Sequence, residues 1–189
     1  SHVIGLGLLD ARSHAVPGLA TDRAEEFSAR YRYHYLAGEP EIVLFEGMHS
    51  MLVDLQSSGV PLAVATGKTR RGLARAFEST GLGQLFASSR CADESQSKPH
   101  PAMLFDLAQE LNVLPHRMLM IGDTTHDLQM AAAAGAQSVG VTYGAHLHAH
   151  LTPHAPLALV NSVSELHTWL LANVFTPSRR APVPRGGAR

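Results

Sequence analysis

The sequence predicts an α/β protein built on a doubly wound parallel sheet. After residue 40, short apolar runs alternate with segments of helical periodicity, and this alternation is typical of a parallel sheet covered by helices on both faces. One run, residues 118–121, leads directly into Gly122, Asp123 and, four positions later, Asp127. Because such sheets bind ligands outside the carboxyl ends of their strands, the polar residues after this run predict a functional site.

The first forty residues predict a small helical domain rather than part of the sheet. Residues 23–35 follow Thr21 and carry Phe27, Tyr31 and Tyr35 four positions apart, a spacing that places the three rings on one face of a helix. No strand pattern occurs in this part. We therefore expect a partial helical cap over residues 1–40, with the aromatic stripe forming its core.

Residues 41–175 are predicted to form the core domain. The helical patterns fall at residues 48–58, 69–79, 101–111, 127–134 and 163–174, and several are followed by a glycine suited to a helix C-terminus. The apolar runs that predict buried strands fall at residues 60–65, 85–89, 118–121, 138–142 and 157–160. Proline, glycine and arginine dominate residues 176–189, which we expect to be a mobile tail.

Composition narrows the classes of function. The chain has 189 residues, 45% of them hydrophobic and 16% charged, as in a globular protein. A formal net charge of -1 does not indicate the excess of positive charge that binding to nucleic acid or an anionic membrane requires. No apolar run approaches the roughly 20 residues that span a bilayer, and no disulfide can form within the chain because Cys91 is its single cysteine. These features predict a cytoplasmic protein that acts on a small soluble substrate.

Polar residues follow three of the predicted strands. They are Thr66 and Gly67 after the first, Lys98 in the loop after the second, and Asp123 and Asp127 after the third. Taken singly, each has a simpler explanation: a threonine or an aspartate caps the next helix, and a lysine lies in solvent. Together they predict a hydroxyl, an ammonium group and two carboxylates at one edge of the sheet.

This set of groups predicts phosphoryl transfer with Mg²⁺ as cofactor. Asp123 and Asp127 supply the oxygen ligands that Mg²⁺ prefers beside phosphate oxygens. Thr66 can donate a hydrogen bond to a phosphoryl oxygen, and the N–H of Gly67, expected at a helix start, suits an anion. Lys98 offsets the charge of the phosphoryl group.

The same residues resemble motifs of a known family. Thr66 within residues 62–68, Lys98 within residues 97–101, and residues 122–127 followed by 131–135 are similar, in order and spacing, to motifs II, III and IV of the haloacid dehalogenase-like hydrolases, in particular the phosphoglycolate phosphatase-like subgroup. The resemblance extends to about residue 174. It implies a Rossmann-like core with a small helical cap, and Mg²⁺-dependent hydrolysis of a small phosphorylated metabolite such as phosphoglycolate.

The resemblance also assigns roles to these residues. Thr66 would bind the phosphoryl group, Lys98 would hold that group and the nucleophile, and Asp123 and Asp127 would serve the metal. The family's first motif, Asp-x-Asp-x-Thr after an N-terminal strand, is absent, since Asp10 has no second aspartate two residues on. The resemblance therefore implies that the first core strand lies upstream of Ser1, that its neighbours expose apolar edges, and that this chain alone is inactive and poorly stable.

Other functions remain open at this point. A catalytically inactive family member could bind phosphorylated ligands or a protein partner, and dehalogenase or phosphomutase chemistry uses the same fold. Gly67 and Lys68 echo the end of a nucleotide-binding P-loop, but that motif requires a glycine where Leu62 stands.

Two further sets of residues have functional and simpler explanations. Four closely spaced histidines could bind a transition metal, although histidines in a solvated loop are the simpler interpretation. They are His146, His148, His150 and His154. The arginines that follow Thr66 could read substrate charge, although a solvated helix face is again simpler: Arg70, Arg71 and Arg75.

Overall fold

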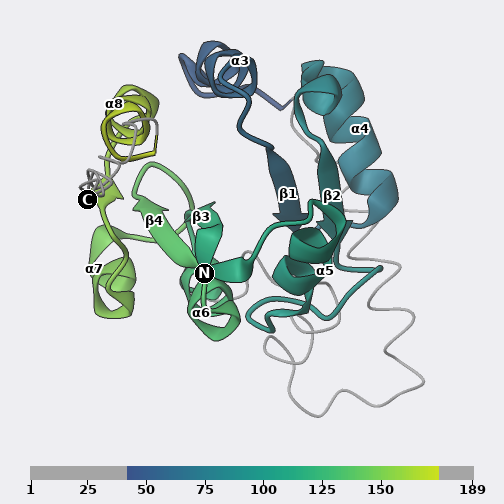
Figure 1. Cartoon of the computed structure of the whole chain (residues 1–189). Helices are drawn as coiled ribbons and strands as arrows, with labels where there is room; N and C mark the ends of the chain where they lie inside the picture. The colour runs from purple at the N-terminus through teal and green to yellow at the C-terminus, as the bar shows by residue number, and fades with distance from the viewer. Residues whose placement is uncertain (1–41, 175–189) are drawn as a thin grey trace, which may run out of the picture.

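The structure, a computed structural model, describes residues 42–174 (Figure 1). The expected cap of residues 1–40, its aromatic stripe and the expected tail of residues 176–189 lie outside the described residues. The domain boundaries drawn from the sequence therefore stay predictions.

Helices and parallel strands alternate along the described chain, as the sequence predicts. The strands are β1 (Ala63–Thr66), β2 (Ser88–Cys91), β3 (Leu119–Gly122), β4 (Gln137–Val141) and β5 (Leu159–Val160). The α-helices are α3 (Met48–Ser57), α4 (Arg70–Thr80), α5 (Ala102–Glu110), α6 (Thr125–Ala134), α7 (His148–Leu151) and α8 (Val163–Asn173). Short 3₁₀ helices lie at Leu82–Leu85, Pro115–Arg117 and Thr152–His154.

The strands form two separate parallel sheets. One contains β1 and β2, with Ala63 opposite Ser88, and the other has the order β3-β4-β5, with Leu119 opposite Gln137. Every pairing is parallel, which confirms the predicted α/β class.

Helices cover both faces of these sheets (Figure 1). One apolar cluster joins α3 and α8 to β4 and includes Leu119 at its margin, whereas a second joins α5 and α6 and includes Met120. Leu119 and Met120 are consecutive residues of β3, and consecutive side chains of a strand point to opposite faces. The two clusters therefore lie on opposite faces, as in a doubly wound fold.

A cavity separates the facing edges of the two sheets. It has a volume of about 530 Å³ and is lined by residues of β1 and β3 together with apolar side chains of α3, α5 and α8. Within the described residues β1 pairs only with β2, and β3 only with β4. The absence of the first core strand, which the family resemblance implies, stays a prediction.

The cavity also corrects the expectation that these strands are fully buried. All four residues of β1 are only half-buried, and Ile121 in β3 is 37% exposed. Apolar runs predict burial on both faces, but here one edge of each strand opens into the cavity.

Several element boundaries differ from the expected ones. The second strand is Ser88–Cys91 rather than residues 85–89, and Leu82–Leu85 forms a 3₁₀ helix instead. The first strand begins only at Ala63, and α6 begins at Thr125, two residues earlier than expected. Cys91, at the end of β2, is completely buried, and burial raises its thiol pKa to about 11.

Candidate active site

Thr66 ends β1 and is not the cap of the following helix. Its Oγ1 accepts a hydrogen bond from the Lys68 N–H at 3.1 Å, which leaves the hydroxyl proton available for donation. The N-cap of α4 is Thr69, whose side chain accepts from the Gly72 N–H at 3.2 Å. Gly67 consequently lies in the turn before α4 rather than in its first turn, which corrects the expectation that its N–H group belongs to the helix start.

Lys98 and Asp127 form a buried ion pair. Lys98 Nζ lies 2.6 Å from Asp127 Oδ1, and the two side chains are only 8% and 5% exposed. Lys98 comes from the segment between β2 and α5, whereas Asp127 comes from α6. The structure thus brings together two of the groups predicted to converge, and it excludes the interpretation of Lys98 as a solvated surface lysine.

Asp127 also closes the N-terminus of α6. Its Oδ2 accepts from the Thr124 N–H at 3.1 Å and from the Thr124 hydroxyl at 2.7 Å, and the Thr124 side chain accepts from the Asp127 N–H in return. This reciprocal capping box satisfies backbone donors that the helix leaves unpaired. Both oxygens of Asp127 are therefore engaged, one by Lys98 and the other by Thr124.

Asp123 is held differently and borders the cavity. It follows β3, is half-buried, and lines the cavity between the sheets. Its Oδ2 accepts from the Ala145 N–H at 2.8 Å, and no hydrogen bond to Oδ1 is found within residues 42–174. Asp123 is thus the carboxylate of the pair with an oxygen left for a cation.

The segment after β4 completes the surroundings of Asp123. The Tyr143 ring packs edge-on against Phe45 with ring centroids 5.0 Å apart, and burial, with the nearby negative charge of Asp123, raises the Tyr143 pKa. His146 is 4% exposed, and its Nδ1 accepts from the Thr125 N–H at 3.1 Å. The sequence pattern does not assign this segment to the site, and His146 stands out in it only as one of the four clustered histidines.

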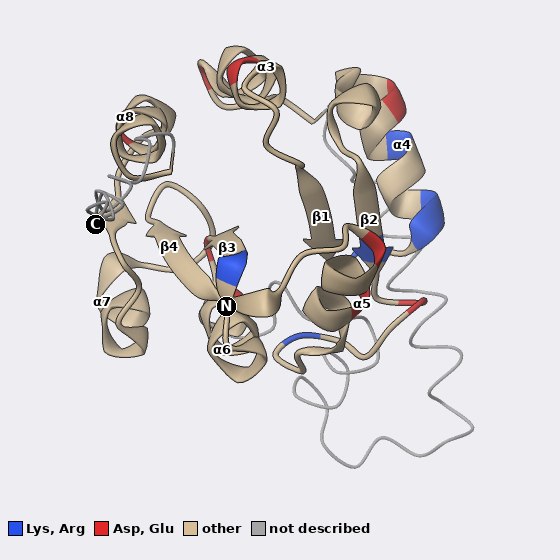
Figure 2. Ribbon diagram, in the orientation of Figure 1, with Lys and Arg blue, Asp and Glu red and all other residues tan. Residues whose placement is uncertain are grey.

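An ion-pair network fastens the end of β2 to the start of α4. Arg70 contacts both carboxylate oxygens of Glu94, at 2.7 and 2.6 Å, and donates to the Ser89 hydroxyl at 2.7 Å. The Arg70 backbone N–H donates to Asp93. The hydrogen bond from Arg70 lowers the Glu94 pKa to about 2. Arg70 therefore has a structural role on the charged surface of α4 (Figure 2), which corrects its interpretation as part of a merely solvated face.

The histidine set does not form a metal centre. No group of three or more histidine, cysteine, aspartate or glutamate side chains in residues 42–174 could hold a metal ion. His148 and His150 are exposed, whereas His146 is buried, so the expectation of four solvated loop histidines is wrong for His146. His148 and His150 also lie in the short helix α7 rather than in a loop.

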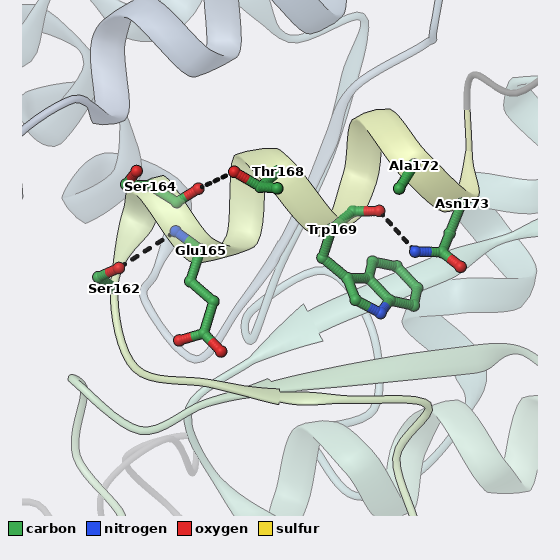
Figure 3. Close-up of a pocket in the computed structure, with 7 residues that line it drawn as sticks. All are labelled: Ser162, Ser164, Glu165, Thr168, Trp169, Ala172 and Asn173. Atoms are coloured by element: carbon green, nitrogen blue, oxygen red, sulfur yellow. Dashed lines mark hydrogen bonds between the residues drawn. The ribbon is translucent and has the colours of Figure 1, made fainter.

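Two other observations concern surfaces outside this site. A hollow on α8 is lined by seven residues of that helix and its N-cap (Figure 3), and none of them belongs to the predicted site. Its hydrogen bonds serve the helix itself, such as that from the Glu165 N–H to Ser162 Oγ.

Among the helices of the described part, none is both long and apolar enough to cross a membrane.

Comparison with known proteins identifies a family and several relatives. A family model described as haloacid dehalogenase-like hydrolase matches residues 2–141. The phosphoglycolate phosphatase of Escherichia coli strain K12 is 32% identical over 136 residues, which are 71% of this chain and 54% of that protein. The corresponding protein of Salmonella typhimurium is 34% identical over the same shares. The chain thus spans about half the length of these relatives.

Solved structures show the same fold. A hydrolase from Pseudomonas syringae aligns with a TM-score of 0.82 at 18% identity, over 91% of this chain and 80% of that one. A haloacid dehalogenase family hydrolase from Deinococcus radiodurans, solved with bound phosphate and sodium, aligns with a TM-score of 0.66 at 23% identity. The alignment covers 87% of this chain and 73% of that one. The family model covers residues 2–141, which is more than half of the chain, and the chain therefore belongs to the haloacid dehalogenase-like hydrolases.

Proposed function

We propose that this chain carries the phosphate-binding and cation-binding part of a phosphatase that hydrolyses small phosphorylated metabolites such as phosphoglycolate. The observation that carries the proposal is the buried pair of Lys98 and Asp127, 2.6 Å apart, beside the more accessible Asp123. Thr66 at the end of β1 adds a hydroxyl donor for a phosphoryl oxygen, and Gly67 a backbone donor. In this role Lys98 is both a catalytic and a phosphate-binding group.

Mg²⁺ fits the donor set through one direct carboxylate. Asp123 has an uncommitted oxygen, whereas both oxygens of Asp127 are engaged by Lys98 and Thr124. Mg²⁺ often uses one or two carboxylates, with waters and substrate oxygens as the remaining ligands. We therefore assign direct coordination to Asp123, and let Asp127 serve the metal site by holding Lys98. A bound Mg²⁺ would neutralise charge on the phosphoryl oxygens.

The nucleophile is the part that this sequence does not contain. An aspartyl-phosphate route needs a carboxylate nucleophile, and no Asp-x-Asp-x-Thr motif occurs in the 189 residues. We propose that the nucleophile enters on an extended segment between β1 and β3. Support comes from the cavity of about 530 Å³ and from the facing strand edges, which pair with nothing across it in the described chain.

An assay with p-nitrophenyl phosphate and Mg²⁺ tests this proposal. The chain alone should show no turnover, and a synthetic peptide with an apolar strand followed by Asp-x-Asp-x-Thr should restore Mg²⁺-dependent hydrolysis. Asp123→Asn should abolish the restored activity, while Asp54→Asn, which changes an exposed carboxylate on α3, should not. Turnover by the chain alone at the rate of a complete relative would contradict the missing nucleophile, and no restoration would contradict the proposed strand position.

A second candidate is a catalytically inactive member that binds phosphorylated ligands or a protein partner. The absent nucleophile motif favours it, because phosphate binding by Thr66 and Lys98 does not require a nucleophile. Phosphate binding without peptide-restored turnover would identify this function. For both candidates we expect a small phosphorylated ligand, no nucleic acid, no membrane and a cytoplasmic location, as the charge and composition indicate.

A further inference from the structure

The carboxylate of Asp123 is in contact with a segment that is remote in the sequence. Residues 143–146 follow β4, about twenty positions after Asp123, and two of them, Ala145 and His146, donate hydrogen bonds to Asp123. The Ala145 N–H donates to Asp123 Oδ2 at 2.8 Å, and the His146 N–H donates to the Asp123 carbonyl oxygen at 3.1 Å. The segment therefore holds both the side chain and the main chain of Asp123.

Gly144 fits closely against the same carboxylate. A Cβ added at Gly144 would lie 2.6 Å from Asp123 Cγ, a separation that real Cβ atoms essentially never show. The obstacle is the Asp123 carboxylate itself, so a side chain at position 144 has to displace that group. Gly144 thus leaves the space that the carboxylate occupies.

His146 connects the segment to the first turn of α6. Its Nδ1 accepts from the N–H of Thr125, the first residue of the helix, at 3.1 Å, and its side chain is buried. Backbone donors in the first turn have no partner within the helix, so a side-chain acceptor from another segment caps this one. Because Thr125 lies between Asp123 and Asp127, this bond fixes the segment against the helix start that separates the two carboxylates.

We infer that residues 143–146 form a positioning element that orients the Asp123 carboxylate before a cation binds, with Gly144 and His146 as positioning residues. The inference rests on the proposed function for its consequence, the cation affinity, but not for the geometry. With Oδ2 held by Ala145, the second oxygen stays directed to one place. Binding then does not have to order the side chain, which lowers the entropic cost of association.

The test measures cation binding and amide exchange on the full chain, with Mn²⁺ as the probe and wild type as reference. His146→Leu removes the acceptor, and we expect Mn²⁺ affinity to fall at least tenfold and protection of the Thr125 amide to be lost. His146→Asn keeps an acceptor at the same branch of the side chain, so it should restore both within about twofold. Gly144→Ala should weaken Mn²⁺ binding at least tenfold and expose the Ala145 amide. Gly83→Ala, whose new Cβ would have the Phe77 side chain as its nearest neighbour, should change neither.

The two measurements separate the inference from the proposed function. Wild-type affinity in both His146→Leu and Gly144→Ala, or unchanged protection of the Ala145 and Thr125 amides in these variants, would overturn the positioning role. If wild type itself binds no Mn²⁺ while the amides lose protection as described, the cation-binding function fails and the positioning role stands. Equal weakening by His146→Asn and His146→Leu would show a packing role only and would overturn the inference.

Discussion

Removal of Lys98 is the most direct perturbation of the site. Lys98→Met keeps most of the aliphatic stem and deletes the ammonium group that lies 2.6 Å from Asp127 Oδ1. Removing one partner of a buried ion pair lowers the free energy of unfolding by about 3–5 kcal/mol. Asp127 keeps two hydrogen bonds from Thr124 and the favourable field of the α6 N-terminus, worth about 0.3–1 kcal/mol, so we expect the lower end, about 3 kcal/mol.

The reciprocal change should cost more. Asp127→Asn leaves the Lys98 ammonium group buried without its counter-charge, and we expect a loss of about 4 kcal/mol. The double variant should lose less than the sum of the two, because the second change removes the group that the first leaves unpaired.

Urea unfolding followed by circular dichroism measures these losses as free energies of unfolding. Arg71→Met, which removes an exposed cation on α4, is the matched control and should change the free energy of unfolding by less than about 0.5 kcal/mol. A loss below about 1 kcal/mol for Lys98→Met, or strictly additive losses in the double variant, would refute the reasoning that this pair is buried and coupled.

Three further variants test other contacts. Because the Arg70 hydrogen bond lowers the Glu94 pKa from 4.5 to about 2, the pair stabilises the fold above pH 4.5, and this contribution disappears as the pH falls towards 2. Glu94→Gln should therefore lower the free energy of unfolding by about 1 kcal/mol at pH 7 after solvent screening, and should weaken the dependence of the urea midpoint on pH between those two pH values. An unchanged pH dependence would contradict the pairing. Gly122→Ala should destabilise the fold by more than about 2 kcal/mol, since its Cβ would lie 2.6 Å from Asp127 Cγ. A thermal unfolding midpoint near that of the wild type would show that the first turn of α6 moves to make room for the methyl group. Leu107→Ala, at a side chain 2% exposed, should cost about 2–5 kcal/mol by urea titration, and a loss below 1 kcal/mol would mean that the adjacent cavity collapses around it.

The helices with a clear apolar face were predictable, because their signal is local. α3, α5 and α8 agree with the sequence to within two residues at each end. β2 was misplaced because its sequence, Ser88–Cys91, has no apolar run; the strand exists through pairing with β1, which the local pattern does not encode. The exposure of Ile121 was not predictable either, because an apolar residue does not reveal whether its strand has a neighbour.

The geometry of the candidate site was predictable where it depends on side chains at strand ends. Lys98 and Asp127 meet as expected, because the segments after parallel strands converge on one edge of a sheet. The segment of residues 143–146 was not found because its contribution consists of backbone N–H groups and the space left by a glycine. Neither leaves a recognisable residue pattern.

The buried thiol of Cys91 can be used to detect local opening of the structure. It is the single cysteine of the sequence, it lies at the end of β2 opposite Thr66, and it is completely inaccessible. Since the thiolate is the reactive form, alkylation has to wait until this end of the two-stranded sheet separates. The rate at which an alkylating reagent labels Cys91 therefore measures how often the β1 side of the proposed phosphate site opens.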